Sequence, residues 1–152
     1  MWLIAYPDAA GTEEKILIFV VRCFSVKDQG NYDEAKKSYD QCLEIEKKLG
    51  NQSGMAAILH ILGNIEYLKG NYDEAKKLYS QSLEITQKLG DQSALATTLA
   101  QLGVLLESEG KLTEAEEYVS RALDIFNKLD DKPSQGKATR HLIGIREKLK
   151  KT

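Results

Sequence analysis

Apolar residues recur every three or four positions over most of the chain, which is the spacing of a helix buried on one side. Between Tyr72 and Leu89 the apolar stripe carries Ala75, Tyr79 and Leu83, and charged or polar residues fill the opposite side. We expect helices near 13–28, 31–49, 53–69, 72–89, 92–109, 112–129 and 134–150. The pattern predicts an all-α fold.

The helical pattern repeats every 40 residues, which is typical of a stacked repeat architecture. Residues 30–69 and 70–109 are identical at 22 of 40 aligned positions, and a third, weaker copy begins at Gly110. Each copy predicts two helices separated by turns at glycines such as Gly70 and Gly90. We expect an N-terminal extension at 1–12, a degenerate repeat at 13–50, repeats at 51–90 and 91–130, and a capping helix at 131–152.

Two glycines stand in the middle of predicted helices, at Gly63 and Gly103. Each costs about 1 kcal/mol relative to alanine, so a structural gain must offset it. Absent side chains let a neighbouring helix come close, and we expect that approach at the alanine column of Ala75 and Ala115.

The segment "LGNIEYLKGNYDEAKKLYSQSLEI" at 62–85 resembles a tetratricopeptide repeat. The matching positions are Leu59, Leu62, Gly63, Tyr67, Gly70, Tyr72, Ala75, Tyr79 and Leu83. The period is 40 residues instead of the usual 34, as in a longer variant found in some signalling and regulatory adaptors. The Gly, Tyr and Ala columns argue against HEAT repeats, and the helical pattern excludes the four short strands of a propeller blade.

The resemblance implies a right-handed α-solenoid of three helix pairs plus a C-terminal capping helix. It also implies a non-catalytic protein–protein interaction scaffold that binds a peptide or helix in its concave groove. In this family the first helix of each pair lines the groove. Transferred to this sequence, the peptide-binding candidates are His60, Asn64, Tyr67, Gln101, Lys137, Arg140 and His141.

One subset of the family grips a peptide carboxylate with Lys, Asn, Asn, Lys and Arg from three successive inner helices. Counted from the first helix, the equivalent residues are unable to hold an anion: Val20, Phe24, Ile61, Thr97 and Gln101. Counted one repeat later, all five can form hydrogen bonds: His60, Asn64, Gln101, Lys137 and His141. We therefore expect an acidic or carboxylate-bearing peptide, bound more tightly below about pH 6.5, where histidines become charged. The alternative is that these are ordinary solvated groove residues.

The predicted first helix is apolar all round, from Ile16 to Val21, and such a helix needs cover. Residues 1–12 could fold over it, another chain could pack on it, or the array could continue. Its self-association candidates are Ile16, Phe19 and Val20. An alternative function is therefore a structural or self-assembling segment of a longer array, with a homo-oligomer as its product.

Composition narrows the partners to proteins. The chain has 152 residues, 42% hydrophobic and 29% charged, and a net charge of −2, which argues against general nucleic-acid binding. Residues 132–152 are basic, as in a solvated capping helix or a tail that binds an acidic partner. The longest apolar run, "ILIFVV", is too short to span a membrane, and the N-terminus lacks the features of a signal peptide. We expect a cytoplasmic protein.

The sequence shows no catalytic motif. Its glycines are single, no HExxH motif or Ser/His/Asp order appears, and the acidic residues are spread over solvated faces. We expect no enzyme activity, no cofactor and no metal site. Cys23 and Cys42 fall in neighbouring columns of the repeat, which indicates either two buried thiols or a redox-sensitive pair.

Overall fold

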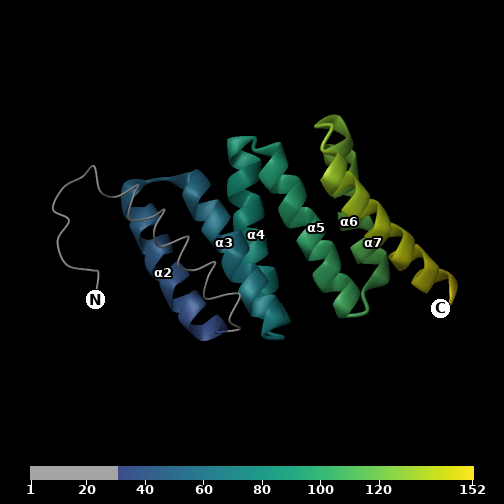
Figure 1. The fold of residues 1–152 in the computed structure, drawn as a ribbon, viewed down its shortest axis with the longest axis horizontal. Coiled ribbons are helices and arrows are strands. Elements are labelled where there is room, and N and C mark those ends of the chain that lie inside the picture. Colours follow the sequence, from purple (N-terminus) through teal and green to yellow (C-terminus); the bar gives the residue numbers. More distant parts are fainter. Residues whose placement is uncertain (1–30) are drawn as a thin grey trace.

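The computed structural model describes residues 31–152 of the chain. In these residues six helices follow one another: α2 (Tyr32–Leu49), α3 (Gln52–Leu68), α4 (Tyr72–Leu89), α5 (Gln92–Ser108), α6 (Leu112–Lys128) and α7 (Lys132–Lys150). They stand in chain order along the long axis of the molecule (Figure 1). The predicted all-α helical repeat is confirmed, and the predicted bounds of these helices agree to within two residues.

The predicted helix at 13–28 lies outside the described residues. Its self-association candidates Ile16, Phe19 and Val20 lie there too, as does Cys23. Cys42 is fully buried between α2 and α3. Self-association and the proximity of the two cysteines therefore stay predictions.

Local residue types set where each helix begins and ends. The side chains of Asn51, Asp91 and Asp131 each accept a hydrogen bond from the backbone amide three residues later, at the starts of α3, α5 and α7. The helix α7 begins two residues earlier than predicted because Asp131 caps it. Pro133 fits inside its first turn, where a missing N–H costs nothing.

The mid-helix glycines are sites of close helix approach, as predicted. A Cβ atom at Gly63 would lie 2.6 Å from the ring atom Cδ1 of Tyr79. A Cβ atom at Gly103 would overlap Cγ2 of Val119 and lie 3.3 Å from the carbonyl oxygen of Ala115. The predicted contact with the alanine column is therefore confirmed at Gly103, and at Gly63 the nearest neighbour is the ring of Tyr79.

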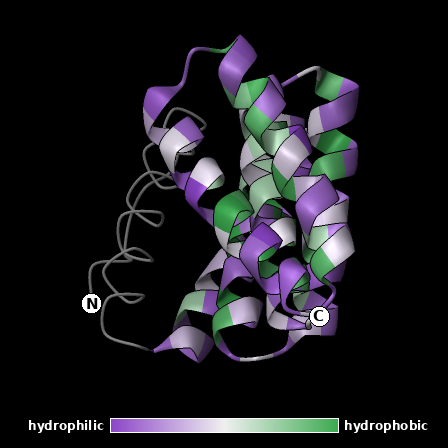
Figure 2. Cartoon of the chain, turned by 90° about the vertical axis from the view of Figure 1, so that its right-hand side faces the viewer, coloured by the Kyte–Doolittle hydropathy of each residue, from purple (hydrophilic) through white to green (hydrophobic). Residues whose placement is uncertain are grey.

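The core runs along the stack as a series of clusters between neighbouring helices. One cluster joins α2 to α3, a second joins α4 to α5, and a third joins α5, α6 and α7. Hydrophobic residues gather where helices face one another (Figure 2). Ala35, Ala75 and Ala115, one per repeat, are fully buried, so the repeated alanine marks the same packing position each time.

Candidate functional site

The helices form an inner and an outer row. The inner helices α3, α5 and α7 contact one another in sequence, whereas the outer helices α2, α4 and α6 contact only inner helices. Helices in contact lie closer together than helices that are not, so the inner row is shorter than the outer row. The stack therefore curves, with α3, α5 and α7 on its concave side. This concave side carries two pockets.

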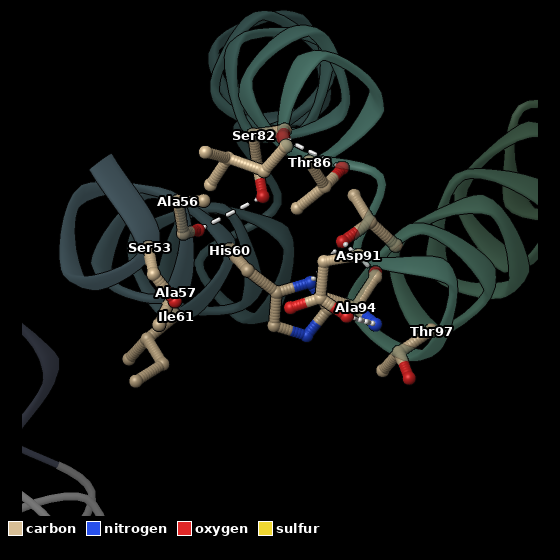
Figure 3. Close-up of a pocket in the computed structure, with 12 residues that line it drawn as sticks. Ser53, Ala56, Ala57, His60, Ile61, Ser82, Thr86, Asp91, Ala94 and Thr97 are labelled. Carbon is tan, nitrogen blue, oxygen red and sulfur yellow. Dashed lines mark hydrogen bonds between the residues drawn. The ribbon is translucent and has the colours of Figure 1, made fainter.

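The first, here called the α3–α5 pocket, lies between α3 and α5 with α4 as its floor. Its volume is about 260 Å³. Figure 3 shows Ser82 and Thr86 pointing from α4 into the space between the other two helices, with the ring of His60 beside them. The lining residues are Ser53, Ala56, Ala57, His60, Ile61, Ser82, Thr86, Leu89, Asp91, Ala94, Thr97 and Thr98.

Four hydroxyl groups of this pocket, those of Ser82, Thr86, Thr97 and Thr98, donate to backbone carbonyls of the helices. Ser82 Oγ donates to the Ala56 carbonyl at 2.8 Å and thereby ties α4 to α3. Thr86 Oγ1 donates to the Ser82 carbonyl at 3.0 Å, and Thr97 Oγ1 to the Ser93 carbonyl at 2.9 Å. A hydroxyl has a single proton, so these groups have no donor left for a ligand. Their methyl and methylene groups line the pocket together with the alanines.

His60 joins α3 to α5 through Thr98. Its Nδ1 lies 3.0 Å from Thr98 Oγ1, and that hydroxyl also lies 3.0 Å from the carbonyl of Ala94. Because the hydroxyl can donate only once, both contacts are satisfied when Thr98 donates to the carbonyl and Nδ1–H of His60 donates to Thr98. The Nδ1 proton is therefore engaged in the scaffold.

The second pocket, here called the α5–α7 pocket, lies one repeat further along the groove. Its volume is about 180 Å³, and Val119 and Phe126 of α6 form its floor. The remaining lining residues are Thr97, Ala100, Gln101, Val104, Ser134, Lys137, Ala138 and His141. A shift of 40 residues relates the two pockets: Phe126 takes the place of Thr86, and Lys137 takes the place of Thr97.

Positive charge surrounds the α5–α7 pocket. Lys137, Arg140 and His141 are exposed on α7, and the Arg140 Nε donates to the Gly136 carbonyl at 3.3 Å. Two carboxylates lie close. Glu107 Oε1 is 2.6 Å from Lys148 Nζ, and its Oε2 is 3.7 Å from His141 Nδ1. Asp131, the N-cap of α7, interacts with the charge of Lys137. Lys148 thus pairs with Glu107, and Lys137 is the lysine that lines the pocket, with Arg140 exposed on the same helix.

The other two predicted residues are bound within the scaffold. Asn64 Oδ1 accepts a 2.6 Å hydrogen bond from Tyr79 Oη, and burial raises the pKa of Tyr79 above its ordinary value. Tyr67 Oη lies 2.9 Å from Ser108 Oγ, and its ring lies 5.5 Å from that of Tyr72. Neither Asn64 nor Tyr67 lines either pocket.

The predicted five-residue anion constellation is therefore divided in space. His60 lies in the α3–α5 pocket, whereas Gln101, Lys137 and His141 share the α5–α7 pocket. Asn64 lines neither pocket and accepts the hydrogen bond from Tyr79. The structure brings together one lysine, one glutamine and one histidine, and adds the nearby Arg140.

The family of the chain follows from its sequence as well as from this geometry. Models of the tetratricopeptide repeat family match residues 54–128 and residues 27–49. The chain is a tetratricopeptide repeat protein. This assignment supports a role as a protein-interaction scaffold, and members of the family are typically non-catalytic.

Solved structures share the fold of this tetratricopeptide repeat protein at low sequence identity. BtubC from P. vanneervenii has a TM-score of 0.65 and 19% identity over 89% of this chain, which spans 64% of BtubC. The putative kinesin light chain repeats of Podosopora anserina have a TM-score of 0.74 and 19% identity, covering 86% of this chain and 65% of theirs.

A third relative by structure was solved with a bound peptide. The type III secretion chaperone SycD of Yersinia enterocolitica, in complex with a peptide of the translocator YopD, has a TM-score of 0.69 and 21% identity. The match covers 95% of this chain and all of SycD. No curated protein matches the sequence.

Reading the tetratricopeptide sequence alone missed the floor of the α3–α5 pocket. Ser82, Thr86 and Thr98 are each 1% exposed, but they are polar, so the apolar pattern does not mark them as buried. The signal lies in the 40-residue register, where Thr86 stands opposite Phe126 and Thr98 opposite Ala138. Polar residues at buried repeat positions could have been noticed there.

Two further features of the described residues bear on function. Between residues 31 and 152, no helix has the length and apolar character needed to cross a membrane. Over the same residues, no group of three or more His, Cys, Asp or Glu side chains could hold a metal ion.

Proposed function

We propose that this chain is a non-catalytic scaffold that binds a peptide or helix of a protein partner along α3, α5 and α7. The observation that carries the proposal is the pair of preformed pockets on the concave side. A preformed surface on packed helices loses little conformational entropy on binding, so more of the contact energy appears as affinity. The SycD complex is a precedent for peptide binding on a related fold.

The partner is proposed to place an acidic or carboxylate-bearing residue at the α5–α7 pocket. Lys137 and Arg140 offer positive charge there, and Gln101 can donate a hydrogen bond from its amide. Glu107 does not prevent this, because Lys148 already neutralises it at 2.6 Å. A carboxylate that approaches Lys137 gains a charge-assisted hydrogen bond.

Binding is proposed to strengthen at acidic pH, where histidine side chains become charged. His141 faces the α5–α7 pocket, so its protonation adds a positive charge close to Lys137. The titratable groups around it are Glu107 on α5 and Lys137, Arg140 and Lys148 on α7. Protonated His141 both attracts the ligand and pairs with Glu107, so we expect an increase of a few fold.

Fluorescence anisotropy with labelled peptides tests this proposal. An acidic peptide and its amidated, neutral counterpart are titrated with the full chain at pH 7.5 and pH 5.5. We expect tighter binding of the acidic peptide, and we expect Lys137→Glu to weaken that binding about tenfold or more. Lys150→Glu is the matched control, because it makes the same charge change at an exposed position of α7 outside the pocket. Equal affinity for both peptides would refute the proposed acidic partner.

A further inference from the structure

The two pockets differ in the side chain that each could accept. They occupy equivalent places in successive repeats, but the α3–α5 pocket is larger, at about 260 Å³ against about 180 Å³. The main cause is the floor, where Thr86 of one repeat corresponds to Phe126 of the next. The smaller side chain leaves room above α4 that the phenyl ring occupies above α6.

The α3–α5 pocket is suited to an apolar group. The hydroxyl groups of Ser82, Thr86, Thr97 and Thr98 donate hydrogen bonds to helix carbonyls. An acidic or amide side chain that left water for this pocket would lose the hydration of its oxygen atoms without gaining those donors, which costs several kcal/mol for a carboxylate. Ala56, Ala57, Ile61, Leu89 and Ala94 supply apolar contacts instead.

The volume fits one large side chain. An apolar cavity of about 150 Å³ is enough to hold benzene, so the space between α3 and α5 has room for a leucine or a phenyl ring. Asp91 lies at its edge, where its Oδ1 accepts from the Ala94 amide at 3.0 Å. That carboxylate disfavours an acidic side chain here and leaves the acidic residue of a partner to the cations of α7.

The spacing between the pockets limits the peptide. Helices in contact lie about 8–10 Å apart, and α5 separates the two pockets as the shared wall, with Thr97 lining both. A peptide in the extended polyproline II conformation advances about 3.1 Å per residue with three residues per turn, so side chains three positions apart lie on the same face. The two anchoring side chains are then about three residues apart.

We infer that the α3–α5 pocket binds a large apolar side chain of an extended peptide whose acidic residue, about three positions away, lies at Lys137 and Arg140. This inference rests on the proposed function, because it assigns a second anchor to the same ligand. The lining of the α3–α5 pocket includes Asp91 and no lysine or arginine, and that of the α5–α7 pocket includes Lys137 and no carboxylate, which favours the acidic residue at the second pocket. These linings do not fix the chain direction, so both sequence orders are tested.

Four labelled peptides on a Gly/Ser background test the inference by anisotropy with the full chain. Two carry leucine and glutamate three positions apart, one in each order. The other two replace leucine by alanine or glutamate by glutamine in the order that binds more tightly. We expect the alanine peptide to bind about tenfold or more weakly, because burial of a leucine side chain is lost.

A pocket-filling variant locates the anchor. Ala57 lines the α3–α5 pocket but is exposed, so Ala57→Phe fills the space without disturbing the core. In this variant the leucine and alanine peptides should bind equally, and the response to glutamate should remain. Ser80→Phe is the matched control, an exposed residue of α4 outside the pockets. Circular dichroism checks that both variants are folded.

The outcomes separate the two claims. If the glutamate peptides bind in a Lys137-dependent way but leucine and alanine are equivalent, the apolar anchor is refuted and the proposed function stands. If replacing leucine weakens binding only when Ala57 is present, and replacing glutamate changes nothing, the apolar anchor stands and the acidic partner is refuted. Absence of binding by all four peptides would overturn both.

Discussion

The helix pairs α3–α4 and α5–α6 pack through equivalent positions 40 residues apart, but the side chains in their interiors differ in polarity. The first pair keeps polar side chains at positions where the second has apolar ones. The equivalent residues are His60 and Ala100, Asn64 and Val104, Glu66 and Leu106, Tyr79 and Val119, Ser82 and Ala122, and Thr86 and Phe126. Ala75 and Ala115 are both completely buried, so the same helix packing accommodates a polar or an apolar interior.

Glu66 shows what the polar interior requires. Its side chain is 2% exposed, its Oε1 lies 2.6 Å from Lys36 Nζ of α2, and its Oε2 accepts a 2.7 Å hydrogen bond from Asn71 Nδ2. Burial acts to raise the pKa of Glu66, but the hydrogen bonds from Lys36 and Asn71 outweigh it, so the pKa lies below its ordinary value. The equivalent Leu106 needs no partner. The polar interior therefore depends on particular contacts, and the apolar one depends on shape.

The largest effects are expected where both pairs have the same requirement, at the mid-helix glycines. Gly63→Leu would drive a side chain into the ring of Tyr79, and Gly103→Leu into Val119 and the backbone at Ala115. We expect each to lower the free energy of unfolding by about 3 kcal/mol or more, measured by urea denaturation.

The glycine prediction has a control in α7. No atom lies within 4 Å of a Cβ placed at Gly144, so Gly144→Leu should leave stability unchanged or raise it by up to about 1 kcal/mol. A loss at Gly144 as large as at Gly63 would show that the contacts at Tyr79 and Val119 are not what requires glycine.

The next effect concerns the ion pair that only the α3–α4 pair contains. Glu66→Gln should lower stability at pH 7 by about 1–3 kcal/mol, because a charged hydrogen-bond acceptor is lost. Since the folded pKa of Glu66 is lowered, its contribution is present above the unfolded value of about 4.5 and is lost as the pH falls through the folded pKa. The gap between native chain and variant should therefore close in acid.

Thermal unfolding from pH 7 to pH 3 measures this gap. Glu117→Gln serves as the comparison, because Glu117 is an exposed residue of α6, and it should have little effect at any pH. A gap at Glu66 that stays constant down to pH 3 would argue against the pairing with Lys36.

A smaller effect is expected at Tyr79, the polar counterpart of Val119. Tyr79→Phe removes the hydrogen bond to Asn64 and should cost about 1 kcal/mol at neutral pH. The folded pKa of Tyr79 is raised, so its stabilising effect is complete below the unfolded pKa of about 10 and is lost as the pH rises above it. Urea denaturation at pH 7 and pH 11 should show the native chain losing stability relative to the variant. An unchanged difference would refute the pKa shift.

The smallest effect separates the two pairs at their C-terminal ends. The helix α4 ends at Gly90, whose φ is 71°, whereas Asp130 adopts a φ of 56° after α6. A non-glycine residue in this left-handed region destabilises the fold by about 1 kcal/mol. The exposed ion pair of Asp130 with Lys132 stabilises it only slightly. Asp130→Gly should raise stability by up to about 1 kcal/mol, and Gly90→Ala should lower it similarly. Differential scanning calorimetry can detect both shifts, and a loss of stability in Asp130→Gly or a gain in Gly90→Ala would contradict the assignment.

The helices were predictable because their signals are local. The apolar period, the capping residues Asn51 and Asp91, and the glycines after α2 and α4 act within a few residues. The helix α7 starts two residues earlier than the apolar pattern indicates, because Asp131 caps it and Pro133 fits within its first turn.

The site was less predictable because it depends on neighbours one repeat apart. Family positions placed His60 and His141 in one constellation, but α5 stands between their pockets. The sequence also contained no indication that Asn64 would accept a hydrogen bond from Tyr79, since that bond depends on how closely α4 approaches Gly63. Long-range contacts of this kind are set by packing.

The succession of contacts along the stack has a consequence for how the chain folds. Each described helix contacts only the next helix or the one after it, so every native contact closes a short loop and costs little chain entropy. Folding can then begin in any helix pair and spread toward both ends, and the pair with the best local packing sets the nucleus. Partial unfolding from one end would leave the remaining pockets intact, so the groove can lose one binding position without losing the others.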